Sequence, residues 1–264
     1  MFLPGPNCGS TCKGHTIYDP SKSSTSKSTG KSFSLAYGDG STVSGTQYTD
    51  TVTLGGLKAT SQRLGVAKQY SDGFESDEFP PDGLLGMAFE QISDYNAPPV
   101  FQTLVSQGSV SSSVFGFTLL DSGSELYVGG IDSSAYSGSI SYTDVTEVGY
   151  WQIEFSGLSV GSKSVLSRST DAIVDTGTTL IIGDSSTVSK FYKQIPGAKS
   201  ASSSLGDGMY TIPCDSDVSA TVTVAGKKFT VSADTLNQGQ VSDGSSTCVG
   251  GVAADDSMGM FFTK

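Results

Sequence analysis

One aspartate of the sequence stands between two apolar segments, where a carboxylate needs partners. The apolar residues 172–174 run into Asp175-Thr176-Gly177, and an apolar run resumes at residues 180–182. A carboxylate enclosed by apolar strands is costly unless it is hydrogen-bonded or paired. Gly177 allows the backbone to approach that carboxylate, and the hydroxyls of Thr176 and Thr178 can hold nearby groups. The alternative is an ordinary β-turn that begins with Asp, but the apolar flanks favour a catalytic Asp175.

The other acidic motifs favour structural roles. Asp121-Ser122-Gly123-Ser124 has a similar pattern, but it lies between two short apolar runs, as the polar turn of a hairpin does. An acidic run typical of solvated surface contains Asp72, Glu75, Asp77 and Glu78.

The inventory of side chains also limits the possible cofactors. The single histidine, His15, argues against zinc sites built on several imidazoles and against a Ser-His-Asp triad. No pattern indicates a metal, a nucleotide or haem, so we expect no cofactor.

The elements that must position Asp175 are predicted to be mainly strands. Short alternating runs bounded by Gly and Ser turns, such as residues 32–37 and 220–224, are typical of an all-β protein. Helices are predicted at residues 99–105, started by Pro98-Pro99, and at 185–194, after a cap signal at Asp184. The polar residues 21–31 are interpreted as a surface loop that leads into a strand.

Composition restricts the partners. The formal net charge is −11, and such a surface repels nucleic acid and anionic lipid. No apolar run is long enough to span a membrane. We therefore expect neither nucleic acid nor membrane as a partner.

Four cysteines allow three disulfide pairings. Their spacing favours a local Cys8–Cys12 bridge and a longer Cys214–Cys248 loop, with buried thiols or a zinc site as the alternatives. Disulfides indicate an oxidising, secreted setting, although the opening residues Met-Phe-Leu-Pro-Gly-Pro lack the features of a signal peptide.

Five motifs, in order along the chain, resemble those of pepsin-like aspartic endopeptidases of the secreted fungal type. One is similar to the tip of the family's flap hairpin, one to its first-lobe apolar-apolar-Gly element, two to its inter-lobe segments and one to its second catalytic loop. They are Tyr37-Gly38-Asp39-Gly40-Ser41, Asp82-Gly83-Leu84-Leu85-Gly86, Gly129-Gly130-Ile131-Asp132, Gly149-Tyr150-Trp151-Gln152-Ile153 and residues 172–180. The cysteines also fall where this family forms disulfides.

The resemblance implies a bilobal, all-β, pepsin-like fold with a few short helices. Residues 1–135 would form an N-terminal lobe with its flap at residues 31–46, and residues 136–264 a C-terminal lobe that carries Asp-Thr-Gly. The implied activity is hydrolysis of peptide bonds in protein substrates at acid pH, by a water activated between two aspartates. A secreted monomer that binds pepstatin-type inhibitors is expected.

The resemblance also implies roles for individual residues. Tyr37, Gly38 and Asp39 would contact substrate from the flap, Phe74 and Leu84 would line an apolar pocket, and Gly177 and Thr178 would bond the substrate backbone. For three of these residues simple packing is the alternative: Tyr37, Phe74 and Leu84.

The sequence departs from the family pattern at both ends. The first-lobe Asp-Thr-Gly is expected upstream of the first disulfide, and no aspartate occurs in residues 1–7. The family's last strands are also expected to be missing, so both lobes would be incomplete and Asp175 would lack its partner carboxylate. We expect these 264 residues alone to be inactive.

Three alternatives to a two-lobed monomeric enzyme remain. They are a non-catalytic peptide-binding homologue, a fragmentary gene product, and a symmetric dimer in which two copies of Asp175 complete the pair.

Overall fold

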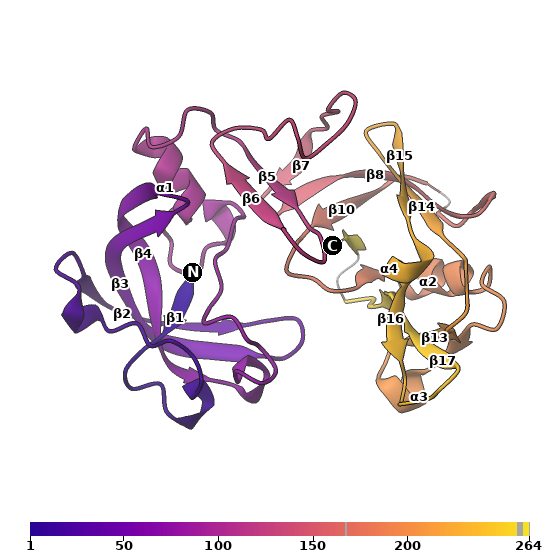
Figure 1. Cartoon of the computed structure of the whole chain (residues 1–264), viewed down its shortest axis with the longest axis horizontal. Coiled ribbons are helices and arrows are strands. Elements are labelled where there is room, and N and C mark those ends of the chain that lie inside the picture. Colours follow the sequence, from indigo (N-terminus) through magenta and orange to yellow (C-terminus); the bar gives the residue numbers. More distant parts are fainter. Residues whose placement is uncertain (167, 258–260, 264) are drawn as a thin grey trace. The chain divides into compact units, whose positions relative to one another are not determined.

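Two compact units make up the chain, shown in a computed structural model (Figure 1). The structure describes residues 1–166, 168–257 and 261–263. The first unit is Met1–Gly138 and the second is Ser139–Lys264. The division follows Gly138, whereas the sequence analysis placed it after residue 135.

A four-stranded sheet in the order β1-β4-β3-β2 is the base of the first unit. β1 (Phe2–Pro4) runs parallel to β4 (Leu57–Tyr70), while β3 (Thr42–Leu54) is antiparallel to both β4 and β2 (Lys27–Ala36). Gly55 and Gly56, both with positive φ, make the tight turn from β3 into β4. The apolar side chains of this sheet are buried with neighbouring aromatic rings in one core, which includes Phe2, Phe33, Val43, Tyr70 and Phe74.

Short helices and one hairpin complete the first unit. The 3₁₀ turns are η1 (Ser10–Cys12), η2 (Pro20–Lys22), η3 (Asp72–Phe74) and η4 (Glu90–Ile92). The helix α1 (Val100–Ser106) buries Val100, Phe101 and Leu104. β5 (Phe115–Thr118) and β6 (Glu125–Val128) form an antiparallel pair.

The second unit contains a larger sheet in the order β15-β14-β8-β10-β19-β11-β18, with β7 and β9 also paired to β8. Its strands are β7 (Val145–Val148), β8 (Trp151–Val160), β9 (Lys163–Ser164), β10 (Thr170–Val174), β11 (Ile181–Gly183), β14 (Ala220–Val224), β15 (Lys227–Val231), β18 (Val252–Ala254) and β19 (Phe261–Thr263).

A smaller sheet and short helices accompany it among the described residues of this unit. The small sheet has the order β12-β13-β17-β16, with β12 (Lys199–Ser200), β13 (Tyr210–Pro213), β16 (Asn237–Gln240) and β17 (Thr247–Gly250). The helices are α2 (Ser185–Tyr192), α3 (Ser202–Leu205) and α4 (Ala233–Leu236). Side chains from both sheets and from α2 share one core, in which Phe155, Val188, Phe191, Ile212 and Val252 are buried.

The structure confirms the mainly β fold and both predicted helices. α1 lies one residue later than predicted, and α2 begins after Asp184, whose carboxylate accepts a hydrogen bond from the Thr187 amide at 3.0 Å. The interpretation of residues 21–31 as a loop was wrong for its second half, because β2 already begins at Lys27. Lys27 and Ser28 pair with β3 through their backbones, which needs no apolar side chains.

Candidate catalytic loop

Strand pairing holds both ends of the loop that carries Asp175. β10 precedes the loop and runs parallel to β19, while β11 follows the loop and is antiparallel to the same strand. β10 and β11 therefore lie on either side of β19, and the loop passes from one to the other at the end of the sheet. Ile173, 1% exposed, anchors β10 in the interior.

The loop itself orients the Asp175 carboxylate. The amide of Gly177 donates to Oδ1 at 2.9 Å, and the hydroxyl of Thr178 donates to Oδ2 at 2.6 Å. A Cβ at position 177 would lie 3.2 Å from Oδ1, so glycine lets the amide approach this oxygen. Each oxygen of the Asp175 carboxylate thus accepts a hydrogen bond from a residue no more than three positions later in the sequence.

Asp175 is more open than its apolar flanks suggested. The expectation of a carboxylate enclosed by apolar strands was wrong, because Asp175 is half-buried and Thr176 and Gly177 are exposed. Burial ends at the last residue of β10: Ile173 is 1% exposed, whereas Val174 is 44% exposed. The loop leaves the sheet on the solvent side, where its carboxylate is accessible to other molecules.

In the first unit, the predicted flap is a hairpin made by β2 and β3. Its turn is closed by bonds from the Tyr37 amide to the Ser41 carbonyl (2.9 Å) and from the Gly40 amide to the Tyr37 carbonyl (3.0 Å). The Asp39 carboxylate accepts from the amide of Ser41 at 2.8 Å and from its hydroxyl at 2.9 Å. Asp39 therefore shapes the turn, while Gly38 is exposed beside it.

Tyr37 combines a packed ring with an accessible edge. Its ring contacts those of Phe2 and Phe74, with centroids 6.3 and 5.5 Å away, and 37% of the residue remains exposed. Burial, followed by the negative charges of Asp94 and Asp39, raises the pKa of Tyr37 to about 12. The phenol is therefore neutral in acid and available as a donor.

The two predicted pocket residues lie in the same aromatic core. Phe74 is 4% exposed and contacts the rings of Phe2, Tyr70 and Phe79 as well as Tyr37, so it presents little surface to a ligand. Leu84 packs against this core, and its carbonyl accepts from the Phe2 amide at 3.0 Å.

The aromatic cluster around Tyr37 and Phe74 is completed by Phe2 and Tyr70, which were not predicted from the sequence. Their proximity depends on the parallel pairing of β1 with β4, two strands separated by some fifty residues, and no local pattern indicates it.

Disulfides join both cysteine pairs, Cys8 with Cys12 and Cys214 with Cys248. Asp121 lies exposed in the turn between β5 and β6, which confirms the hairpin interpretation of its motif. Within the described ranges, no three His, Cys, Asp or Glu side chains cluster as a metal site would require. None of the described helices has the length and apolar character needed to cross a bilayer.

Comparison with known proteins assigns the family. The family described as "Eukaryotic aspartyl protease" matches residues 1–261. The chain is 40% identical over 256 residues to an "Aspartic protease" of Phaffia rhodozyma, covering 96% of this chain and 62% of the relative. It is 40% identical over 255 residues to penicillopepsin-3 of Penicillium janthinellum, covering 95% and 63%. It is 41% identical over 253 residues to endothiapepsin of Cryphonectria parasitica, covering 94% and 59%.

The chain thus spans about three fifths of the length of these relatives while matching them over nearly all of its own residues. The family match, the mainly β architecture and the Asp-Thr-Gly loop agree with one another. The chain belongs to the eukaryotic aspartyl protease family.

Proposed function

We propose that this chain supplies Asp175 as one of the two catalytic carboxylates of a pepsin-like aspartic endopeptidase, an enzyme that hydrolyses peptide bonds of proteins at acid pH. The observation that carries the proposal is the solvent-accessible Asp175 carboxylate, held by donors from Gly177 and Thr178. A carboxylate fixed in this way can meet a water and a substrate in one orientation. In the proposed enzyme, the first unit is the N-terminal lobe and the second is the C-terminal lobe.

The chemistry requires a second carboxylate beside Asp175. Two carboxylates in contact cannot both ionise easily, so they share one proton, and aspartic proteases are the standard example of this arrangement. The ionised carboxylate takes a proton from the attacking water, and the protonated one donates a hydrogen bond to the scissile carbonyl. The donors from Gly177 and Thr178 keep Asp175 aligned while the shared proton moves.

The remaining predicted contacts belong to the same proposal. The Gly177 amide is already bonded to Asp175, so Gly177 would meet a substrate through its carbonyl oxygen. Thr178 donates its hydroxyl proton to Asp175 and would likewise meet a substrate as an acceptor. On the flap, Gly38 offers exposed backbone and Tyr37 a neutral phenol, while Asp39 keeps the turn in shape. Phe74 and Leu84 would support an apolar pocket wall.

Setting and partners follow from the same interpretation. Two disulfides indicate an oxidising, extracellular setting. The partners are protein or peptide substrates and pepstatin-type inhibitors, bound by a monomer. One observation favours a second candidate, a peptide-binding protein without turnover: the 264 residues contain a single Asp-Thr-Gly.

The test supplies the second carboxylate. A fusion that places a relative's first-lobe Asp-Thr-Gly segment ahead of Phe2 should cleave a denatured protein at about pH 4, and a pepstatin-type inhibitor should block it. Asp175→Asn in that fusion should reduce kcat at least about 100-fold, the contribution of a lost acid–base group. Asp171→Asn is the matched control, because Asp171 lies on β10 and accepts from the Thr146 hydroxyl at 3.1 Å.

Two outcomes would contradict the proposal. Turnover that survives Asp175→Asn would show that Asp175 is not catalytic. A fusion that binds the inhibitor, with an affinity reduced by Asp175→Asn, but never cleaves would favour the peptide-binding candidate.

A further inference from the structure

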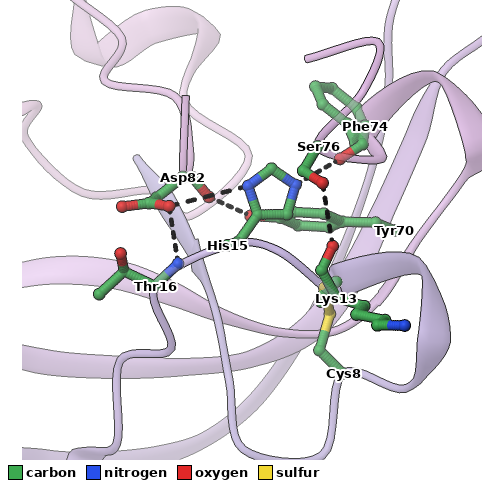
Figure 2. Close-up of polar contacts among 9 residues, drawn as sticks. Cys8, Lys13, His15, Thr16, Tyr70, Phe74, Ser76 and Asp82 are labelled. Atoms are coloured by element: carbon green, nitrogen blue, oxygen red, sulfur yellow. Dashed lines mark hydrogen bonds and ion pairs between the residues drawn. A yellow bond between two sulfur atoms is a disulfide. The ribbon is translucent and has the colours of Figure 1, made fainter. Parts of the chain in front are cut away.

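The only histidine of the sequence, His15, lies in the interior of the first unit. Its side chain is 0% exposed and extends from the loop after the Cys8–Cys12 disulfide toward η3 (Figure 2). Its Nε2 is 2.8 Å from the carbonyl oxygen of Phe74. Because a carbonyl oxygen only accepts, Nε2 carries the hydrogen and donates it.

The other ring nitrogen faces a carboxylate. Nδ1 of His15 is 3.7 Å from Oδ1 of Asp82 and makes no hydrogen bond with any described residue. In the neutral imidazole Nδ1 is an acceptor, and the ionised carboxylate oxygen is an acceptor too, so no hydrogen bond joins them. A proton on Nδ1 would place a positive charge 3.7 Å from Oδ1 of Asp82, within ion-pair distance of that carboxylate.

Other charged and titratable groups around the ring do not replace Asp82. The Lys13 side chain extends away from the imidazole in Figure 2. Tyr70 packs edge-on against the ring at 5.6 Å and donates to the Asp82 carbonyl at 2.8 Å; burial, and then the charge of Asp82, raises its pKa, so it stays neutral. Asp72 and Glu75, near Phe74 in η3, are exposed. Asp82 is the one carboxylate of the described chain within ion-pair distance of His15.

The His15–Asp82 contact joins segments that support the flap hairpin. His15 holds the carbonyl of Phe74, whose ring packs on Tyr37. Just before η3, the Ser71 amide donates to the Thr42 carbonyl of β3 at 2.9 Å. Asp82 accepts from the Thr16 amide at 2.7 Å and stands two residues before Leu84. A change at this contact would therefore reach η3 and the base of the hairpin.

We propose that His15 and Asp82 form an acid-engaged clamp in which Asp82 is the counter-ion of a buried, protonated His15. A buried charge without a partner strongly destabilises a fold. Once His15 takes up a proton, the negative charge of Asp82 keeps the imidazolium in place, and the loop at residues 12–16 stays attached to η3. The clamp concerns the first unit alone and does not depend on peptide hydrolysis.

The test removes the charge of Asp82 and keeps its shape. In Asp82→Asn the side-chain carbonyl can still accept from Thr16, but the counter-charge is lost. Asp77→Asn is the matched control, because Asp77 is exposed on the segment between η3 and Asp82. Amide hydrogen exchange of residues 12–16 and 71–79 in the full chain is compared with wild type at pH 5 and pH 7. The two pH values are compared because only a protonated imidazole needs the counter-charge of Asp82.

Asp82→Asn should speed exchange in both segments about three- to tenfold at pH 5, a modest factor because the Asp82 side chain is 43% exposed and its charge is partly screened. At pH 7 the same variant should match wild type within about twofold, and Asp77→Asn should match wild type at both pH values.

In a His15→Gln background, where the amide can still donate to Phe74, Asp82→Asn should have the same effect on exchange at the two pH values. Equal effects of Asp82→Asn at pH 5 and pH 7 with His15 present would overturn the proposal.

A spectroscopic readout tests the proton directly. Because the chain has one histidine, labelling with ¹⁵N-histidine gives signals from a single imidazole. The folded wild type should show a hydrogen on Nε2 throughout and a second one on Nδ1 at pH 5. A folded protein whose Nδ1 stays unprotonated at pH 5 would also overturn the clamp.

Discussion

Removing one hydroxyl, in Tyr192→Phe, should destabilise the second unit far more than the loss of a single atom suggests. Tyr192 ends α2, and its hydroxyl donates to the Val252 carbonyl at 2.6 Å and accepts from the Val252 amide at 3.1 Å. Val252 begins β18, the edge strand next to β11. The hydroxyl thus satisfies both backbone groups of an edge residue that faces away from β11.

The magnitude follows from what remains after the substitution. Phenylalanine keeps the ring, including its stacking on Tyr210 at 4.2 Å, so little packing is lost. The Val252 amide and carbonyl lose their partner, and Val252 is 1% exposed. Each unsatisfied buried group costs about 1–3 kcal/mol, and we expect a total of about 2–4 kcal/mol because an edge strand can admit a bridging water.

Urea unfolding followed by the fluorescence of Trp151 measures this loss. Trp151 is the only tryptophan of the sequence and lies on β8, so its signal reports the second unit. With a urea dependence of about 2 kcal/mol per molar for a unit of this size, the midpoint should fall by about 1–2 M. Tyr210→Phe is the control, because it removes a hydroxyl that makes no hydrogen bond with a described residue.

A shift of less than about 0.3 M for Tyr192→Phe would refute the reasoning, since it would mean that the edge groups of Val252 do not need this hydroxyl. An equal shift for Tyr210→Phe would refute it as well, since loss of a tyrosine hydroxyl would then be harmful regardless of its bonds. Because β18 pairs with β11, which follows the Asp175 loop, Tyr192→Phe should also loosen that loop.

Three further predictions concern one charge and the two disulfides. Burial alone would raise the pKa of Asp50, but hydrogen bonds led by those from Thr25 and Tyr18 outweigh it and lower the pKa. Because the pKa of Asp50 is lower in the folded state, its ionised carboxylate stabilises the fold at pH values above the unfolded-state pKa of about 3.9, and this stabilisation is lost as the pH falls below it. Asp50→Asn should therefore lower the free energy of unfolding by about 1–2 kcal/mol near pH 6 and by progressively less below pH 4. Near-ultraviolet circular dichroism in urea measures this difference. The Cys214–Cys248 bridge spans 34 positions, so replacing both cysteines with serine should lower the free energy of unfolding by about 3–4 kcal/mol, measured through Trp151. The same change at Cys8 and Cys12, four positions apart, should cost the first unit about 2 kcal/mol and leave the Trp151 transition in place.

Elements with a local sequence signal were predictable. The helix after Asp184 has its cap in its own first turn, and alternation of apolar residues marks β14. The start of β2 was not predicted, because its polar residues pair through their backbones. The parallel pairs β1–β4 and β11–β18 were not predicted either, because each joins residues far apart in the sequence and depends on how the whole unit packs.

The candidate site also has features that the sequence predicted and features that it did not. The motif at Asp175 predicted a loop whose own amide and hydroxyl hold the carboxylate, and both donors lie within three residues of it. The predicted burial of Asp175 was wrong, because its exposure depends on where β10 and β11 leave the sheet rather than on how apolar these strands are. His15 and Asp82 meet only because η3 and the segment before Leu84 fold against the first disulfide loop, and a lone histidine gives no sign of such a partner.

The orientation of Asp175 and its catalytic use are separable properties. Its two donors come from the loop itself, and the loop is held by strands of its own unit, so the geometry needs nothing beyond the second unit. Sharing one proton, in contrast, requires a second carboxylate, and Asp175 alone can supply only one of the two roles. The 264-residue protein should therefore show an ordered Asp175 loop together with no hydrolysis, and a second Asp-Thr-Gly should restore hydrolysis without rearranging that loop. The loop's order and the enzyme's activity are then set by different parts of the polypeptide, so substitutions that disturb Gly177 or Tyr192 test the first, and only the added carboxylate tests the second.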